Sequence, residues 1–425
     1  MDTTPHYTTP DRLQVGMYIH LDLSWMDHPF SFSNFMISDE QQLAEVRALG
    51  LERIRFDPLR GTGPRTTGDG PETETPAAAL TAPAAEQADR SDDQRQLRLR
   101  AMHQAIHDCD QQFSLAVTQV KLIEREITSQ AAKTLPKAHD LIDSMVDSLM
   151  SEGDIVLHAM QFRDGVAERF VHSLNVTVLA LILARVSDMS AEEARCIGMG
   201  SLLHDLGKQR IPDRVTHNPD PLTRAEAALL QQHPAFGADF ARENRLPENV
   251  IQIILQHHEC FDGSGYPARL KQDQISPLAR IVAVANSYDN LCNPFNPAEA
   301  LSPYEALALM FARMPQKFDP ELLKLLIKTL GVYPPGSIVQ LSDGRYGLVI
   351  SVNPSKPMRP YVVLYAPDVP RDTPQIINLG DENGLAIQHC LRQNQMPREV
   401  QAYLSPGKRI CYFFHHDRLH SGDPG

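Results

Sequence analysis

The sequence has little cysteine, and its cysteines are scattered. Six occur in 425 residues, and no two of them form a Cys-x-x-Cys pair. Disulfide frameworks and thiolate zinc sites both need cysteines at regular spacings. Neither kind of site is therefore expected.

Long apolar runs are also missing. The longest, Val176 to Ala184 with Thr177 inside it, is far shorter than the roughly 20 residues that a membrane-spanning helix needs. The first residues lack the basic-then-apolar order of a signal peptide. We therefore expect a soluble, cytoplasmic protein that does not bind a membrane.

Positive charge is in deficit. Lysine and arginine together number 40, against 53 acidic residues, which gives a formal net charge of −13. A protein that binds nucleic acid or an anionic membrane through its surface usually has the opposite balance. We therefore expect neither nucleic acid nor an anionic membrane as a partner. The net charge does not exclude a small anionic ligand held by local cations or metal ions.

Composition and periodicity predict a mainly α chain. An all-helical domain is preceded by a small α+β module and followed by a β-rich extension. Helix starts are marked by capping boxes, and no strand alternation interrupts the pattern from about 136 to 330. The predicted segments are a module at 1–60, a flexible Pro- and acid-rich linker at 61–93, a helical connector at 94–154, the helical domain at 155–333 and the extension at 334–425.

Five short stretches carry the strand predictions, and three of them lie in the extension: Ile338 to Leu341, Tyr346 to Val352 and Tyr361 to Tyr365. Leu13 to Leu23 alternates apolar and polar residues, as a half-buried strand does, and Arg53 to Asp57 follows a helical stretch as a second strand. In the extension, Asp343-Gly344 lies between two apolar runs and predicts a hairpin.

The connector carries an apolar stripe with heptad spacing. Its positions, 4-3-4-3 apart, are Met102, Ile106, Cys109, Phe113, Ala116, Val120, Ile123 and Ile127. Such a stripe is typical of a coiled-coil seam. Two interpretations stay open: a homodimer through the 94–135 helix, or simple packing against the domain that follows.

The helical domain concentrates histidines beside carboxylates. Glu168 and His172 are four residues apart on one predicted helix face. The remaining members of this set are His204-Asp205, His233, His257-His258, Asn286 and Asp289. Imidazole and carboxylate together suit transition metals, and a carboxylate can bridge two ions about 3.5–4 Å apart. Each motif alone is weak, but the ordered set predicts a multinuclear hydrolytic site.

A lysine adds phosphate chemistry to this set. Lys208 follows His204 by about one helical turn. An ammonium group at that place would supply positive charge to a phosphate oxygen.

These motifs resemble those of a known family. His204-Asp205-Leu206-Gly207-Lys208, His257-His258-Glu259 and Asp262-Gly263-Ser264-Gly265-Tyr266-Pro267 are similar to the HD-GYP domain of bacterial cyclic di-GMP phosphodiesterases, over residues 155–333. The N-terminal segment, with Gly16-Met17-Tyr18 and Ser24 to Phe30, resembles the small uncharacterised domain that often precedes HD-GYP domains.

The resemblance implies roles for individual residues. His172, His204, His233, His257 and His258 would be metal ligands, Asp205 a bridging ligand, and Glu168 a ligand in members with a third metal. Lys208 would contact a substrate phosphate, and Tyr266 would lie at the substrate pocket or at a surface that docks a diguanylate cyclase. The implied cofactors are two or three divalent metals, iron or manganese. The implied reaction uses a metal-activated hydroxide to open cyclic di-GMP to pGpG, with a second cut to GMP left open.

The sequence departs from the family pattern at two functional places. Asn286 stands where the family usually has an aspartate ligand, and Cys292 to Pro297 replaces an Arg-Pro-Tyr segment that helps to hold substrate. Two alternatives to an active phosphodiesterase therefore remain. One is a catalytically weak or inactive HD-GYP module that senses cyclic di-GMP or docks a protein, and the other is a phosphohydrolase of another nucleotide.

Overall fold

The structure is a computed structural model of the whole chain. It describes residues 6–21, 34–37, 43, 46–47, 49, 51, 53–57, 84–151, 154–160, 168–216, 221–353, 356, 358–371, 374–382, 384–392, 395–404 and 410–417. Contacts divide the chain into two compact units, Met1–Thr81 and Ala82–Gly425, and each is described by itself. The domain boundaries predicted inside the second unit remain predictions.

The first unit is built on a four-stranded antiparallel sheet. Its strands are β1 (His6–Thr8), β2 (Tyr18–His20), β3 (Asn34–Met36) and β4 (Ile54–Asp57), in the order β1-β4-β2-β3, and the 3-10 turn η1 (Pro10–Arg12) follows β1. The strand predicted over Leu13–Leu23 is shorter than expected. The chain turns at Gly16, which has φ +91°, so only Tyr18–His20 pairs. Leu13 and Ile19 are nevertheless buried.

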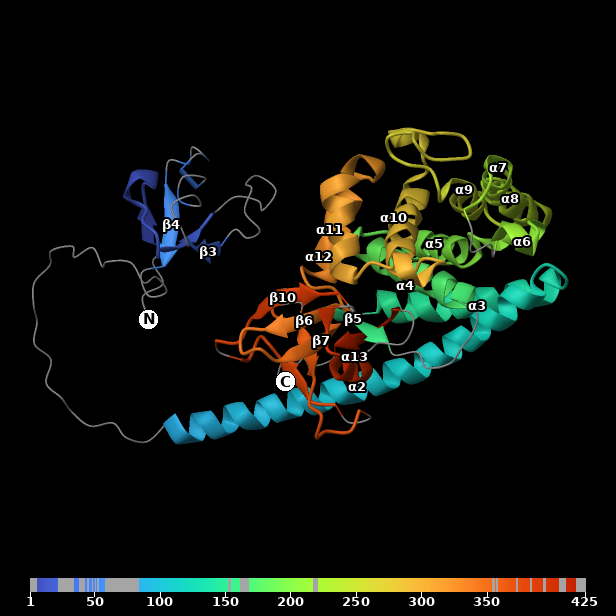
Figure 1. Cartoon of the computed structure of the whole chain (residues 1–425). Coiled ribbons are helices and arrows are strands. Elements are labelled where there is room, and N and C mark those ends of the chain that lie inside the picture. Colours follow the sequence, from blue (N-terminus) through green and yellow to red (C-terminus); the bar gives the residue numbers. More distant parts are fainter. Residues whose placement is uncertain are drawn as a thin grey trace, which may run out of the picture. The chain divides into compact units, whose positions relative to one another are not determined.

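The second unit begins with the long helix α2 (Ala84–Glu126), followed by α3 (Ala131–Met150). α2 starts inside the range predicted as linker, and residues 61–83 of that range lie outside the described residues. The predicted heptad stripe is buried from Cys109 to Ile127 in one core with α3, α4, β5 and β11. Packing within the same chain therefore accounts for this part of the stripe. α2 runs along both the helical part and the β-rich part (Figure 1).

The helical part holds the predicted helices at the predicted starts. Its elements are α4 (Glu168–Val186), α5 (Ala191–Leu203), η2 (Leu206–Arg210), α6 (Asp213–Thr216), α7 (Arg224–Leu230), α8 (His233–Glu243), α9 (Glu248–Gln256), η3 (Gln272–Gln274), α10 (Pro277–Cys292), η4 (Pro297–Glu299), α11 (Pro303–Arg313), η5 (Pro315–Lys317) and α12 (Pro320–Leu330). Capping boxes at Ser190, Thr223 and Ser302 open α5, α7 and α11, because each side chain accepts an otherwise unpaired N–H of the first turn.

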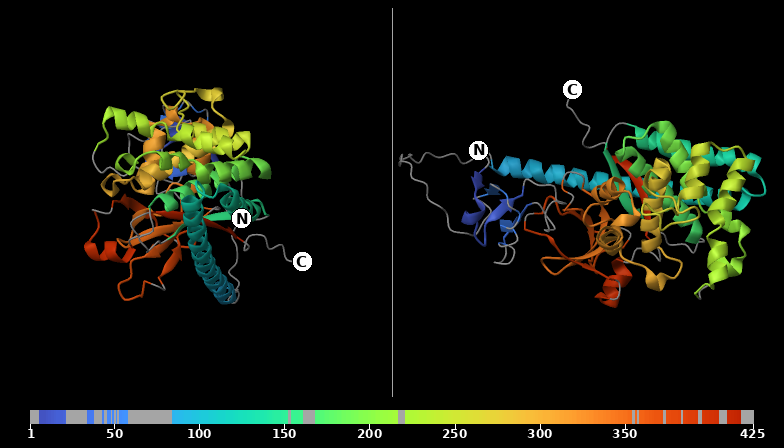
Figure 2. Two further views of the ribbon diagram at one scale, coloured as in Figure 1. Left: turned by 90° about the vertical axis from the view of Figure 1, so that its right-hand side faces the viewer. Right: turned by 90° about the horizontal axis from the view of Figure 1, so that it is seen from above.

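The β-rich part is an antiparallel sheet beside these helices (Figure 2). Its strands are β5 (Asp154–Met160), β6 (Ile338–Leu341), β7 (Tyr346–Ser351), β8 (Tyr361–Leu364), β9 (Ile376–Asn378), β10 (Ile387–Leu391) and β11 (Cys411–Asp417), with α13 (Arg398–Leu404) before β11. The path β10-β6-β7-β5-β11 is extended at β7 by β8 and β9. The predicted hairpin is confirmed, since β6 and β7 pair across Gly344, whose φ is +86°.

One element corrects the sequence interpretation. The region from 136 to 330 is not helical throughout, because β5 forms a strand that pairs with β11 along its whole length, from Met160 with Cys411 to Asp154 with Asp417. The partner lies more than 250 residues away along the chain, so no local pattern could announce it. The mainly α fold class, with a small α+β module and a β-rich extension, is confirmed.

No helix in the described ranges combines the length and the apolar character that crossing a membrane would require.

Candidate metal centre

Three histidines sit at helix ends and are oriented in the same way. His204 caps α5, His257 caps α9, and His233 follows the end of α7 as the first residue of α8. The Nδ1 of each bonds the carbonyl oxygen three residues earlier, at 2.6 Å (Ser201), 2.7 Å (Ile254) and 2.7 Å (Leu230). Helix ends leave such carbonyls without an N–H partner. Because the carbonyls can only accept, each ring carries its proton on Nδ1 and turns the lone pair of Nε2 inward.

His172 on α4 is fixed by a carboxylate instead. Its Nδ1 lies 2.6 Å from Oδ2 of Asp289 on α10, and its Nε2 lies 3.2 Å from Nε2 of His204. Oδ2 of Asp205 is 3.7 Å from Nε2 of His172 and 3.5 Å from Nε2 of His204. His172, His204 and Asp205 therefore converge on one point.

A second group converges on the other oxygen of Asp205. Nε2 of His233 and Nε2 of His257 are 3.1 Å apart, and they lie 3.3 Å and 3.9 Å from Asp205 Oδ1. His258 completes this group, with its ring centroid 5.0 Å from that of His233. One carboxylate thus faces both groups, which is the position that a bridging ligand needs.

The donor set fits divalent cations. Four of the five imidazoles have Nδ1 engaged, so their Nε2 lone pairs face one another in two pairs at hydrogen-bond distance with no proton between them. Asp205 Oδ1 is also buried without a hydrogen bond among the described residues. Buried acceptors left unpaired cost free energy, and a cation between these atoms would remove the cost at both groups. Nitrogen and oxygen donors without thiolate suit Mn, Fe, Co, Ni or Zn.

Burial and neighbouring charges keep several of these side chains in the protonation states that metal binding needs. Burial lowers the pKa of His204 to about 4. Burial, followed by repulsion from neighbouring imidazoles, lowers the pKa of His257 and His258 well below the usual range. Burial alone would raise the pKa of Asp205, but Lys208 and His204 outweigh it and hold that pKa well below the ordinary value. At neutral pH His204, His257 and His258 are therefore neutral and Asp205 is ionised.

Lys208 and Tyr266 border the cluster. Lys208 on η2 places its Nζ 2.6 Å from Asp205 Oδ2, and its side chain remains 40% exposed, so it can also reach a ligand from solvent. The ring of Tyr266 stacks on His258 with centroids 4.6 Å apart. Burial raises the pKa of the Tyr266 hydroxyl, which therefore stays protonated at neutral pH.

Glu259 has a supporting role that the sequence alone did not assign. Its buried carboxylate accepts the backbone N–H of Ala268 at 2.6 Å and of Leu270 at 2.9 Å. These hydrogen bonds hold the chain just after the Gly263–Pro267 loop. The signal that could have found this role is a carboxylate directly after His257-His258 and just before a loop rich in Gly and Pro.

Two predicted ligands are less well accounted for. Glu168 is the first residue of α4, and its side chain lies outside the described residues. Asn286 is buried on α10, and its Oδ1 accepts a hydrogen bond from Asn290 at 2.7 Å. The residue on α10 that contacts the histidine cluster is Asp289, which the sequence suggested only as a substitute for Asn286.

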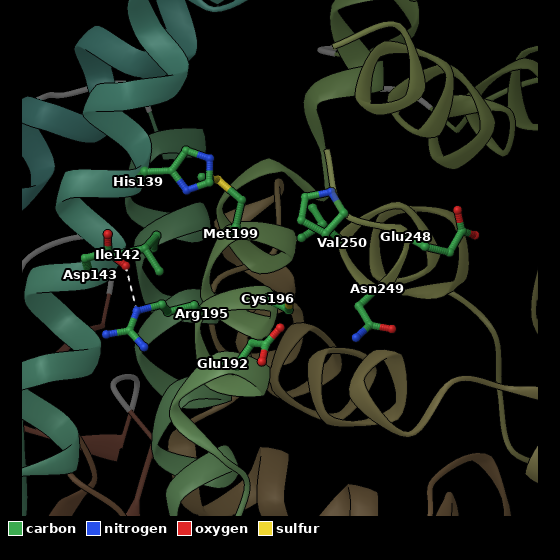
Figure 3. A pocket seen from close by; sticks show the side chains of 11 residues that line it. His139, Ile142, Asp143, Glu192, Arg195, Cys196, Met199, Glu248, Asn249 and Val250 are labelled. Atoms are coloured by element: carbon green, nitrogen blue, oxygen red, sulfur yellow. Dashed lines mark hydrogen bonds and ion pairs between the residues drawn. The ribbon is translucent and has the colours of Figure 1, made fainter. Parts of the chain in front are cut away.

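A cavity of about 340 Å3 lies elsewhere, among α3, α5 and the start of α9 (Figure 3). Met199 and Val250 line it together with Arg195, whose guanidinium is already paired with Asp143 and Asp147. None of the histidines of the cluster lines this cavity, so we do not assign it to the candidate centre.

Comparisons with known proteins match the parts of the chain separately. Residues 139–322 match the HD domain, residues 8–153 a domain of unknown function (DUF3391), and residues 338–399 a KOW domain associated with the HD domain. The N-terminal domain of uncharacterised function expected from the sequence is thereby confirmed, while the bounds of the predicted module at 1–60 stay a prediction.

Three curated relatives are similar to this chain. A cyclic di-GMP phosphodiesterase of Pseudomonas aeruginosa is 30% identical over 357 residues, which cover 83% of each chain. A cyclic di-GMP phosphodiesterase response regulator of Xanthomonas campestris pv. campestris is 37% identical over 172 residues, covering 40% of this chain and 45% of the relative. A 3′3′-cGAMP-specific phosphodiesterase of Vibrio cholerae is 31% identical over 192 residues, covering 44% and 36%.

Proposed function

Because this chain belongs to the HD-domain family and, by its HD and GYP motifs, to the HD-GYP group within it, we propose that it is a metal-dependent phosphodiesterase that hydrolyses cyclic di-GMP in bacterial signalling. The observation that carries the proposal is the convergence of five imidazoles on the two oxygens of Asp205, with the Nδ1 atoms of four of them already engaged. A structural histidine cluster would have no reason to turn its free nitrogens toward one another.

The metal ligands in this proposal fall into two groups that share Asp205. His233, His257 and His258 would hold one ion, and His172 and His204 the other. When bound, such ions polarise phosphate oxygens and lower the pKa of water. Iron and manganese are the proposed metals, and Glu168 is the proposed ligand of a third ion. If Glu168 binds an ion, Glu168→Ala will lower the metal count of the purified protein without unfolding it.

The chain's own groups would position the substrate. Lys208 neutralises part of the charge of Asp205 at 2.6 Å, and its exposed ammonium would bind a non-bridging oxygen of the scissile phosphodiester. Tyr266 presents a neutral hydroxyl and an aromatic face beside His258, a surface on which a guanine base could stack. Asp205 would be a ligand of both ions, which together would supply positive charge to the phosphate during an in-line attack on phosphorus.

The catalytically weak alternative rests on Asn286, because an amide ligand brings no charge to the second ion. In that case the module would sense cyclic di-GMP or dock a diguanylate cyclase through the Tyr266 loop. The experiment loads purified protein with Mn(II) or Fe(II), measures bound metal, and follows pGpG and GMP by chromatography. Product formation with bound metal supports the phosphodiesterase, and bound metal without product favours the sensor.

The other-nucleotide alternative is tested in the same assay. The similarity to a 3′3′-cGAMP-specific relative makes 3′3′-cGAMP the competitor of choice. A higher kcat/KM for cyclic di-GMP than for 3′3′-cGAMP supports cyclic di-GMP as the substrate. The reverse order would replace it.

Oligomeric state enters the proposal only in a restricted form. A homodimer through the 94–135 helix would need a surface other than the stripe from Cys109 to Ile127, which is buried within its own chain. Light scattering of the full chain measures whether it is a monomer or a dimer in solution.

A further inference from the structure

The C-terminal strand β11 is hydrogen-bonded to the support of the candidate metal centre. Two buried asparagines make the connection, Asn175 on α4 and Asn293 at the end of α10. Their Nδ2 groups both donate to Asp289 Oδ1, each at 2.8 Å. Asp289 in turn accepts from His172 through its other oxygen. The two asparagines therefore fix the carboxylate that orients His172.

The same asparagines bond the backbone of Ile410, the residue directly before β11, and of Tyr412 within the strand. Both donate to the carbonyl oxygen of Ile410, at 2.8 Å and 2.9 Å. Asn293 Oδ1 accepts the N–H of Ile410 at 2.9 Å, and Asn175 Oδ1 accepts the N–H of Tyr412 at 3.0 Å. Each amide is thus satisfied on one side by Asp289 and on the other by the backbone of β11.

A second contact fixes the strand to the same helix. The hydroxyl of Tyr412 lies 3.1 Å from that of Tyr288, the residue next to Asp289 on α10, and both side chains are fully buried. β11 also pairs with β5 along its whole length. The β-rich sheet therefore fixes the position of β11, and β11 in turn contacts α4 and α10.

We propose that β11 completes the metal site: through Asn175 and Asn293 it holds Asp289, and through Asp289 it sets the tautomer and orientation of His172 as a ligand of the second ion. Asn175 and Asn293 are positioning residues in this scheme. Without the backbone groups of Ile410 and Tyr412, both amides would lose partners in a buried site and could turn away from Asp289. This inference rests on the proposed two-ion site and assigns a role to the C-terminal extension within it.

The physical reason why His172 is the sensitive ligand is its different anchor. His204, His233 and His257 bond carbonyls of their own helices or of the helix just before them, only three residues away. The anchor of His172 lies 117 residues away on another helix, and its carboxylate is itself held by Asn175 and Asn293. Loss of the asparagine contacts should therefore weaken the ion held by His172 and His204 and leave the ion at His233, His257 and His258 in place.

The test is a titration of metal-stripped full-length protein with Mn(II), followed by calorimetry and by electron paramagnetic resonance, which reports coupling between two bound manganese ions. The variants are Asn293→Ala and Asn175→Ala. Removing a partner outside the ligand shell typically costs about 10- to 100-fold in metal affinity. We expect that loss at one of two sites, together with loss of the coupled spectrum.

Two matched variants control for general loss of packing. Thr177→Val removes a buried hydrogen bond to Ser173 on the same helix α4. Asn378→Ala removes the hydrogen bonds that the side-chain amide oxygen of Asn378 accepts in the β-rich part. Neither touches the Asp289 network, and both should keep two sites. The double variant Asn293→Ala with Asp289→Asn should bind Mn(II) no more weakly than Asp289→Asn alone, because Asn293 acts on His172 only through Asp289.

The outcomes separate the inference from the function beneath it. Wild-type binding of two ions by both asparagine variants overturns the inference and leaves the proposed function standing. Equal loss of both ions, in the variants and in the controls, also overturns it, because the effect is then only structural. Wild-type protein that binds neither Mn(II) nor Fe(II) removes the proposed function and this inference together. If Asn175→Ala does not fold, Ile410→Pro decides, because it removes the N–H donated to Asn293 and keeps both asparagines.

Discussion

A Cβ atom on Gly207 would lie 1.9 Å from the carbonyl oxygen of His233. The turn η2, which follows His204-Asp205, therefore passes the start of α8 at a distance that only glycine allows. This close approach brings Asp205 within reach of His233. The glycine of the His-Asp-Leu-Gly-Lys motif is thus required for packing, and the residues around it for chemistry.

Gly207→Ala should separate η2 from α8. We expect a destabilisation of about 1–3 kcal/mol and loss of metal from the His233 side, measured by thermal unfolding and by metal analysis. Gly344→Ala is the control, since it strains a hairpin residue with φ +86° but meets no atom within 4 Å. Equal metal content in Gly207→Ala and wild type would contradict the packing argument.

Asp205→Ala should abolish turnover and deplete both metal positions. It removes the one charge that faces both groups of imidazoles, and the several kcal/mol that bound ions contribute correspond to roughly a 10³-fold loss of rate or more. Activity and metal content are measured on the same preparation. Asp273→Asn, at an exposed carboxylate paired with Arg280, should behave as wild type. Full activity of Asp205→Ala would rule out the site.

Glu259→Gln should loosen the loop that carries Tyr266 without emptying the site. Glutamine can accept only one of the two N–H groups that Glu259 holds and turns a donor toward the other, at a cost of about 1–3 kcal/mol. We expect kcat/KM to fall while the metal count stays unchanged. Asp262→Asn is the matched control, because its oxygen can still accept the N–H of Ser264. Simultaneous loss of metal would mean that Glu259 supports the ligands themselves.

Asn286→Asp should raise metal affinity if position 286 serves the second ion. An aspartate retains the acceptor for Asn290 and adds a negative charge on a buried face of α10. The apparent Kd for Mn(II) should decrease, as measured by calorimetry. Asn290→Asp adds the same charge one turn further on, at an exposed position, and should change the Kd less. An unchanged Kd in Asn286→Asp would exclude position 286 from the ligand set.

Metal-stripped protein should lose stability as pH falls from about 6.5 to about 4. The folded pKa of His204 is about 4, against an ordinary pKa of 6.5 for histidine, so between these values the unfolded chain binds the extra proton. Stability is therefore complete above pH 6.5 and declines below it, by about 3 kcal/mol for this group. Asp205 adds to the decline only below its ordinary pKa of 3.8. Urea unfolding at stepped pH measures the slope. A His204→Asn variant should reduce it, and His257 and His258, whose pKa values are also lowered by burial, should account for the remainder.

Local chemistry explains why much of the fold was predictable. The capping boxes at Ser190, Thr223 and Ser302 involve residues three apart, and the β6–β7 hairpin depends on a turn with Gly344 at positive φ. Such signals are complete within a short window of sequence. The strand β5 was not predicted, because its partner β11 lies at the far end of the chain.

The amino-acid sequence alone determined which side chains are available to the candidate metal centre, namely the imidazoles and the carboxylate, and which of them lie at helix ends. Only the tertiary structure decided their geometry. It turned four Nδ1 atoms outward, gave Asp289 rather than Asn286 the contact with His172, and linked that contact to β11. The physical reason is that a ligand's identity is written in one residue, whereas its direction is set by hydrogen-bond partners that can lie more than a hundred residues away.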